Sequence, residues 1–238
     1  MSQTYIIVGD SWSMGEFSAE EFGPPIHRGL AQYLEDDGHQ VISLSLAGIS
    51  NWDQCHKLTA WFERHDEKVD GVFAFQTGFE KDLKYTYNHA YRSLEDLIMH
   101  YLFGYYQRLS GVYKKYGVPV YVIGSKCDAM LFDDIEQTLP GVNIVCQSLF
   151  NLLLYNNPNI DEPVYSWFDR TTIDMVKQLH SSLGSDELAR MLDHIDRGGI
   201  RDNMVSWTTE WYWPDGAHLN RHAYRKLYDF LRDQGIVP

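Results

Sequence analysis

The sequence predicts an α/β fold in three layers, α/β/α, around a mainly five-stranded parallel sheet. Short apolar runs bounded by glycine, proline or polar residues read as buried strands. Segments with a helical period separate these runs through the first 150 residues, as in βαβ units. A chain of 238 residues most simply forms one such domain. We therefore expect a single domain over residues 1–238, with helices on both faces of the sheet.

The five strands are expected at residues 5–8, 41–46, 71–75, 119–124 and 142–145. The first consists of aromatic and β-branched residues and stops at Gly9-Asp10-Ser11. Ala47-Gly48 closes the second strand, and Gln76-Thr77-Gly78 closes the third. Polar residues thus follow the first and third strands at their carboxyl ends, the edge of an open α/β sheet where ligands bind.

Helices are expected from about Ile26 to just before Gly38, from about Asn51 as a candidate N-cap to Phe62, from about Ser93 to Tyr116, and through Tyr224 and Leu231 up to Gly235. Each shows apolar residues at helical spacing, and glycine follows three of them as a stop. Residues 150–211 differ in character, with helical patterns around residues 175–183 and 186–195. We expect this segment to be a helical insertion before the last helix, capping or flanking a site.

Charge and cysteine content exclude several classes of protein. The formal net charge of −13 and the pI near 5.1 predict repulsion from phosphate backbones and anionic membranes, so we expect neither a nucleic-acid nor a membrane partner. Three cysteines, Cys55, Cys127 and Cys146, are far apart and odd in number, which argues against a disulfide framework or a Cys-x-x-Cys site. They are expected to be buried thiols. With no signal-peptide pattern and no apolar run of membrane-spanning length, the expected location is cytoplasmic.

Ser11 and His218 are the candidate nucleophile and general base. Asp215 precedes His218 by three residues on a loop with a glycine, so its carboxylate could bind one ring nitrogen and leave the other free to take a proton from a serine hydroxyl. Two alternatives remain open for these residues: Ser11 as a helix N-cap, and Asp215 in a turn that caps the last helix. A metal site is not expected, because neither a His-Glu-x-x-His motif nor a second close histidine pair is present.

The stretches around Ser11 and His218 resemble the SGNH/GDSL hydrolase family, whose members carry Gly-Asp-Ser after their first strand and Asp-x-x-His near their C-terminus. Here the motifs are Gly9-Asp10-Ser11 and Asp215-x-x-His218. The resemblance implies a flavodoxin-like three-layer fold and a Ser-His-Asp triad of Ser11, His218 and Asp215, with no cofactor.

The resemblance also implies an oxyanion hole built from the backbone N–H groups of Ser11 and Gly48 and from an asparagine side chain after the third strand. The family shows Gly-x-Asn-Asp there, whereas this chain has Gln76-Thr77-Gly78-Phe79-Glu80, so Gly78 stands where asparagine is expected. Gln76 and Asn51 are candidate substitute donors. Gln76 is equally well read as an ordinary polar strand end.

The function expected is that of a serine esterase, which hydrolyses a carboxylic ester through an acyl-enzyme. The substrate would be a small-molecule or glycan ester, with an O-acetylated carbohydrate as the first candidate. Trp12, Tyr212 and Trp213 flank the motifs and could line the substrate cleft, although aromatic residues are also ordinary core material. Two alternatives remain. Glycine at position 78, in place of the asparagine donor, favours a catalytically impaired protein that binds a carbohydrate or a protein partner. An acyltransferase would use the same catalytic residues as an esterase.

Overall fold

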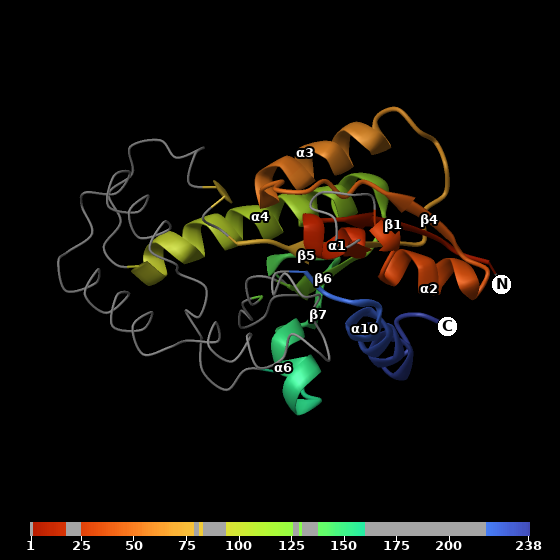
Figure 1. Ribbon diagram of the computed structural model, residues 1–238. Helices are drawn as coiled ribbons and strands as arrows, with labels where there is room; N and C mark the ends of the chain where they lie inside the picture. Colours follow the sequence, from red (N-terminus) through yellow and green to blue (C-terminus); the bar gives the residue numbers. More distant parts are fainter. Residues whose placement is uncertain are drawn as a thin grey trace.

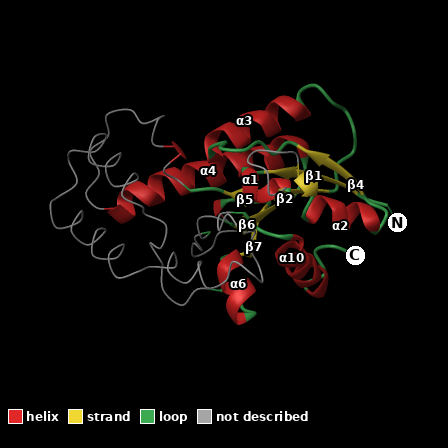
Figure 2. Ribbon diagram, in the orientation of Figure 1, coloured by secondary structure: helices red, strands yellow, loops and turns green. Residues whose placement is uncertain are grey.

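The computed structural model describes residues 2–17, 25–78, 81–82, 94–125, 129, 138–159 and 218–238. Its sheet strands are β1 (Thr4–Val8), β4 (Gln40–Ser43), β5 (Gly71–Gln76), β6 (Val120–Gly124) and β7 (Val142–Cys146). The helices are α1 (Ser11–Met14), α2 (Leu30–Asp36), α3 (Asn51–Phe62), α4 (Leu94–Tyr116), α6 (Leu149–Tyr155) and α10 (Arg221–Asp233). Two short strands, β2 (Glu16–Phe17) and β3 (Pro25–His27), form a separate antiparallel ribbon (Figure 2).

The main sheet is parallel throughout and has the strand order β4-β1-β5-β6-β7. Ile6 of β1 stands opposite Ile42 of β4 on one side and Val72 of β5 on the other. The chain therefore leaves β1 in one direction and returns to its other side, which makes the carboxyl end of β1 the topological switch point of the sheet. Ligands bind at such points in open α/β sheets. The predicted fold class is confirmed.

Helices cover both faces of the sheet (Figure 1). In β1, Ile6 and Val8 join the core under α3 and α4, while Tyr5 and Ile7 join the core under α2, α6 and α10. Because successive strand residues point to opposite faces and both faces are covered, every residue of β5 is buried. This explains why β5 reads as a continuous apolar run and not as an alternating one.

Three boundaries differ from the sequence-based expectation. Ile26 belongs to β3, and the helix begins only at Leu30, after Gly29 with φ 59°. The second strand ends at Ser43, although the N–H groups of Leu44 and Leu46 continue its bonding to β1 and Gly9. Ser50, not Asn51, caps α3, because its Oγ accepts the Asp53 N–H at 3.1 Å. A serine that precedes the helix can bond back to its first turn, whereas Asn51 is already helical.

Other expectations lie partly or wholly outside the described residues. Helix α6 opens the segment that was expected to be an insertion, and the two helical patterns within it lie outside the described residues. Cys55 and Cys146 are buried thiols, as expected, and Cys127 lies outside the described residues. Within the described part of the chain, no helix is both long and apolar enough to cross a bilayer.

Candidate active site

Ser11 lies at the first position of α1, immediately beyond β1. Asp10 adopts an extended conformation and caps this helix, and its Oδ1 accepts the Trp12 N–H at 3.0 Å. The turn Gly9-Asp10-Ser11 between β1 and α1, called the Ser11 corner below, is tightly packed. A Cβ on Gly9 would lie 2.5 Å from Ser13 Oγ and 2.7 Å from Phe75 Cβ. Only glycine therefore fits between β1 and α1. Asp10 is the cap and Ser11 is not, which leaves the Ser11 side chain half-buried at the carboxyl edge of the sheet.

The Asp10 carboxylate is fully buried and binds three groups from two separate parts of the chain. While Oδ1 caps α1, Oδ2 accepts the Thr77 hydroxyl at 2.6 Å and the Lys81 ammonium, also at 2.6 Å. Thr77 and Lys81 come from the segment after β5. A buried carboxylate is stable only with such hydrogen bonds and a countercharge. The middle residue of the Gly-Asp-Ser motif thus joins the turn that carries Ser11 to the segment that follows the neighbouring strand, β5.

Gly48 occupies a tight turn beside Gly9. The Leu46 N–H donates to Gly9 O at 3.0 Å, and the Ile49 N–H donates to Leu46 O at 3.1 Å, which closes a turn from residue 46 to residue 49. Gly48 is the third residue of that turn and has φ 73°, a conformation that favours glycine. The turn is exposed and follows β4, the neighbour of β1. It is thereby held against the same corner as Ser11.

The two candidate amide donors, Gln76 and Asn51, are both buried and hydrogen-bonded at the end of β5. Gln76 is fully buried; its Oε1 accepts the Tyr106 hydroxyl at 2.5 Å, and its backbone carbonyl accepts the Ser125 hydroxyl at 2.5 Å. Asn51, also buried, donates from Nδ2 to Thr77 O at 3.0 Å and to an oxygen of Asp82 at 2.9 Å. Both of its N–H groups are therefore occupied, so that an oxyanion could receive one only if a bond were exchanged.

Asn51 instead clamps the segment on which the family places its asparagine. Its Oδ1 accepts the Thr77 N–H at 2.9 Å, so that its amide holds the backbone of Thr77 from both sides. Asp82 completes the clamp by accepting the Trp52 N–H at 2.8 Å. Burial raises the pKa of Asp82, although these hydrogen bonds oppose the rise. Gly78, where the family's asparagine would stand, is buried in the same segment.

His218 stands two residues before Asn220, the N-cap of α10. Asn220 accepts the Ala223 N–H at 3.1 Å, which fixes the start of the helix. The His218 ring is partly exposed and packs on Phe17, with ring centroids 4.8 Å apart. Phe17 follows α1 closely in the chain, so His218 contacts the segment that continues from Ser11. Asp215 lies outside the described residues.

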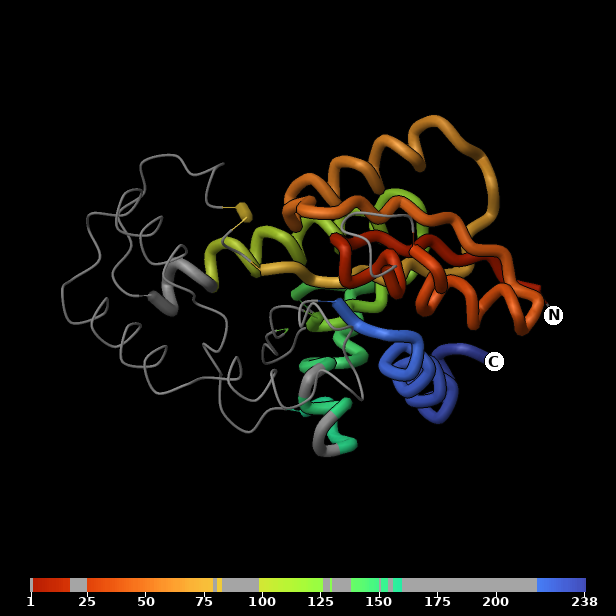
Figure 3. Tube along the Cα trace, in the orientation of Figure 1, coloured from red at the N-terminus to blue at the C-terminus, as the bar shows by residue number. Residues whose placement is uncertain are grey.

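Two further contacts bind α10 to the segment that follows Ser11. Glu16 accepts the Arg221 backbone N–H at 2.8 Å, its Nε at 2.7 Å and its Nη2 at 3.3 Å. The buried Tyr224 hydroxyl donates to Trp12 O at 2.8 Å. Figure 3 shows the blue helix α10 beside the red segment that contains α1 and α2. The start of α10, and with it His218, is held beside the corner that presents Ser11.

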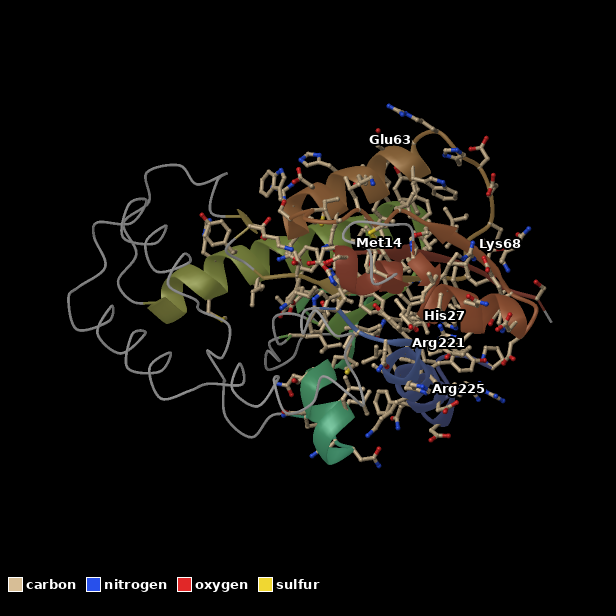
Figure 4. The ribbon with its side chains drawn as sticks, in the orientation of Figure 1. Met14, His27, Glu63, Lys68, Arg221 and Arg225 are labelled. Carbon is tan, nitrogen blue, oxygen red and sulfur yellow. The ribbon has the colours of Figure 1, made fainter. Side chains whose placement is uncertain are left out.

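Arg221 controls the charge of the buried residues around this contact. Burial alone would raise the pKa of Glu16, but the hydrogen bonds and the charge of Arg221 outweigh it and hold that pKa below its ordinary value. His27 pairs with Glu16 across the β2–β3 ribbon, and burial together with the charge of Arg221 lowers its pKa. His27 and Arg221 are labelled next to each other in Figure 4.

Of the three aromatic residues expected to line the substrate cleft, the structure describes Trp12 alone. Trp12 is only 4% exposed and packs in the core between the sheet and α10, so it follows the core alternative. Tyr212 and Trp213 lie outside the described residues.

Sequence reasoning missed Lys81, Thr77, Glu16 and Tyr224. No local motif marks them, because each binds a residue distant in the chain. The only signal available was the place of Thr77 directly after a strand and of Tyr224 in the first turn of the last helix.

Comparisons with known proteins add likenesses at low identity. No family model matches the chain, nor does any curated protein. Among solved structures it is similar to a psychrotrophic esterase from Pseudoalteromonas sp., with 14% identity, 98% of this chain and 96% of that chain covered, and a TM-score of 0.44. A member of the lipolytic protein G-D-S-L family from Veillonella parvula shows 11% identity, covers 98% and 97%, and has a TM-score of 0.42. An acetylxylan esterase from Geobacillus stearothermophilus, a catalytic mutant, shows 16% identity, covers 99% and 96%, and has a TM-score of 0.39.

Proposed function

We propose that the protein is a serine ester hydrolase that uses Ser11 as nucleophile, His218 as general base and Asp215 as the group that orients His218. The observation that carries this proposal is the attachment of α10 to the Ser11 corner by Glu16–Arg221 and Tyr224–Trp12 contacts. A serine needs a base within reach to be reactive at neutral pH, and the attachment of the start of α10 to that corner supports His218 in this role.

The reaction would proceed in two halves. Ser11 Oγ attacks the ester carbonyl carbon while His218 takes its proton, and the N–H groups of Ser11 and Gly48 bind the oxygen that becomes negative. The tetrahedral intermediate collapses, and His218 returns the proton to the departing alcohol. Water, deprotonated by His218, then attacks the acyl-Ser11 ester, which releases the acid and restores the serine. The first substrate to test is an O-acetylated carbohydrate.

A second candidate function is binding without turnover. It is favoured by the commitment of both Asn51 N–H groups to Thr77 and Asp82, together with glycine at position 78, because these leave the third oxyanion donor without an obvious source. Loss of one such donor typically reduces the rate about 100-fold to 1,000-fold. The intact combination of Ser11 with His218 and Asp215 speaks for catalysis.

The test is hydrolysis of p-nitrophenyl acetate, butyrate and octanoate and of acetylated xylan oligosaccharides by the wild type and by Ser11→Ala, His218→Ala and Asp215→Asn. We expect His218→Ala to lower kcat about 100-fold to 10,000-fold and Ser11→Ala to abolish the acyl-enzyme. The matched control is His222→Ala, an exposed histidine on α10, which should retain the activity. Circular dichroism confirms that each variant is folded.

A covalent readout separates the two candidate functions. A fluorophosphonate should add to Ser11 of the wild type, as seen by intact-mass and peptide mass spectrometry, and not to Ser11→Ala. Full activity of Ser11→Ala would overturn the proposal. A folded wild type that neither hydrolyses these esters nor takes up the phosphonate would do the same and would favour the binding role. Formation of a new ester with added methanol or sugar in place of hydrolysis would identify an acyltransferase.

A further inference from the structure

Asp10 is a charged group with almost no access to water. Its side chain is 1% exposed, and the cation that compensates it is Lys81, 2.6 Å away and 22% exposed. Lys81 follows β5 and is therefore part of a different βα connection from the one that carries Ser11. An unpaired buried carboxylate is strongly unfavourable, so the position of Asp10 depends on this ammonium group.

The two oxygens of Asp10 transmit this dependence to the nucleophile. Oδ2 is held by Lys81 and by the Thr77 hydroxyl, which sets the orientation of the carboxylate. With that orientation fixed, Oδ1 accepts the Trp12 N–H one residue after Ser11. The same turn sets the direction of the Ser11 N–H, which the proposed function uses as an oxyanion donor.

The segment that carries Lys81 starts at the end of β5, where hydrogen bonds hold the backbone of Thr77. Asn51 holds Thr77 through both its N–H and its carbonyl, and the Lys81 N–H donates to Gly78 O at 3.3 Å. Lys81 thus links an immobilised strand end to the turn that presents the serine.

We propose that Lys81 is a positioning residue, which acts through Asp10 to hold the first turn of α1, and the Ser11 N–H within it, in place for catalysis. The catalytic part of this inference rests on the proposed function, whereas the link from Lys81 to the turn is a physical property that can be measured without substrate. Where the resembled family places an asparagine side chain, this chain uses an ion pair to join the same segment to the serine's turn.

The chain contains a matched control at the other end of β1. Lys68 Nζ lies 2.6 Å from Asp70, and Asp70 in turn accepts the Thr4 N–H at 2.9 Å, so that lysine, aspartate and backbone N–H are connected in the same order. Lys68 is 86% exposed, in contrast to Lys81. Figure 4 shows Lys68 well separated from Met14 of α1. Lys68→Met therefore removes the same group without touching the Ser11 corner.

The first experiment is amide hydrogen exchange by NMR on the wild type, Lys81→Met, Lys81→Arg and Lys68→Met. In Lys81→Met we expect the protection of the Trp12 and Ser13 N–H groups to fall about 10-fold or more, while the Asp53 N–H at the α3 cap stays within about 3-fold. Lys81→Arg should restore most of the protection, and Lys68→Met should leave it unchanged. Equal protection at Trp12 in the wild type and in Lys81→Met would overturn the inference.

A second pair of variants covers the case in which Lys81→Met fails to fold. Asp10→Asn and Asp10→Asn/Lys81→Met both remove the buried charge, and an asparagine can still accept the Trp12 N–H. If Lys81 acts through the Asp10 charge, the two should show Trp12 protection within about 2-fold of each other, since the effects of residues in one network are not additive. A further loss in the double variant would mean that Lys81 acts by another route, and the inference would fall.

Ester hydrolysis by the same proteins tests the catalytic part. We expect Lys81→Met to lower kcat about 10-fold to 100-fold with KM within about 2-fold, and Lys81→Arg to recover most of the rate. If the wild type does not hydrolyse esters while Trp12 protection depends on Lys81, the proposed function fails and the positioning link stands. If the wild type hydrolyses esters and Lys81→Met retains the full rate, the catalytic role of Lys81 is wrong and the hydrolase stands.

Discussion

Glu16 and Arg221, separated by 205 positions in the chain, are joined by three hydrogen bonds at 2.7 to 3.3 Å. One comes from the backbone N–H at the start of α10 and two come from the guanidinium group, so the carboxylate binds both the helix end and its first side chain. A carboxylate at a helix N-terminus is also favoured by the helix dipole. The contact fixes where α10 begins, and therefore where His218 lies.

Arg221→Met should lower the free energy of unfolding by about 1–3 kcal/mol. The Glu16 side chain is 3% exposed and would lose its countercharge, while the 48% exposure of Arg221 keeps the effect below that of a fully buried pair. Urea denaturation at pH 7 measures it. Arg225→Met, on the next turn of α10, is the control: the Arg225–Asp229 pair is about half exposed on both sides, and its loss should change stability by no more than about 1 kcal/mol. Equal effects of the two substitutions would contradict the prediction.

His27 should make the protein less stable in weak acid. Burial and the charge of Arg221 lower its pKa in the folded state, while Glu16 and Asp36 act in the opposite direction. An unfolded chain protonates histidine near pH 6.5, so below that pH the unfolded state binds more protons and stability falls as the pH falls. We expect His27→Gln, which can still accept the Gly29 N–H, to reduce this loss between pH 7 and pH 5. Urea titrations at several pH values measure the slope, and an unchanged slope would refute the assignment.

Gly9→Ala should destabilise the fold by about 1–3 kcal/mol and reduce fluorophosphonate labelling of Ser11. The added Cβ would meet Ser13 Oγ and Phe75 Cβ at less than contact distance, and neither is a flexible chain end. Gly104→Ala is the matched substitution: Gly104 is in α4 with open space around it, so alanine there should stabilise the protein by about 0.5–1 kcal/mol. Thermal unfolding of both variants measures the change in stability, and the rate of fluorophosphonate labelling measures the effect on Ser11. An unperturbed Gly9→Ala would show that the corner is not tight.

Tyr224→Phe should cost about 1–2 kcal/mol, because it removes a buried hydrogen bond from the tyrosine hydroxyl to the Trp12 carbonyl. The tyrosine is fully buried, and burial raises the pKa of its hydroxyl, so the group stays a donor throughout the neutral range. Tyr33→Phe is the control: its hydroxyl also donates to a backbone carbonyl, that of Arg221 at 3.0 Å, but this bond is exposed and water can replace it. Urea denaturation compares the two, and a larger loss from Tyr33→Phe would contradict the prediction.

The inner strands of the sheet could be predicted from the sequence because burial on both faces imposes an unbroken apolar run. The start of α2 could not be predicted, because Ile26 lies four residues before Leu30 and so fits the helical period. The pairing of Glu16 with His27 shows that Ile26 belongs to the β2–β3 ribbon. Turn glycines were also informative: Gly48 was expected to follow the second strand, and its positive φ gives the physical reason for glycine at that position.

The candidate site was predictable where its chemistry is local. Gly9-Asp10-Ser11 and the histidine before α10 could be found as motifs, whereas the partners of Asp10 could not, because Thr77 and Lys81 reach it only after β5 has paired with β1. For Trp12 the local sequence was misleading. Its position beside the serine suggested a substrate cleft, but its burial is decided by α10, which lies at the far end of the sequence.

The placement of α10 has a consequence for synthesis of the protein. One face of the sheet, with Ile7 and Phe73, shares its core with Leu227 and Leu231, so it is incompletely covered until α10 has been synthesised. A nascent chain that lacks α10 would therefore display an apolar surface of the kind that chaperones hold.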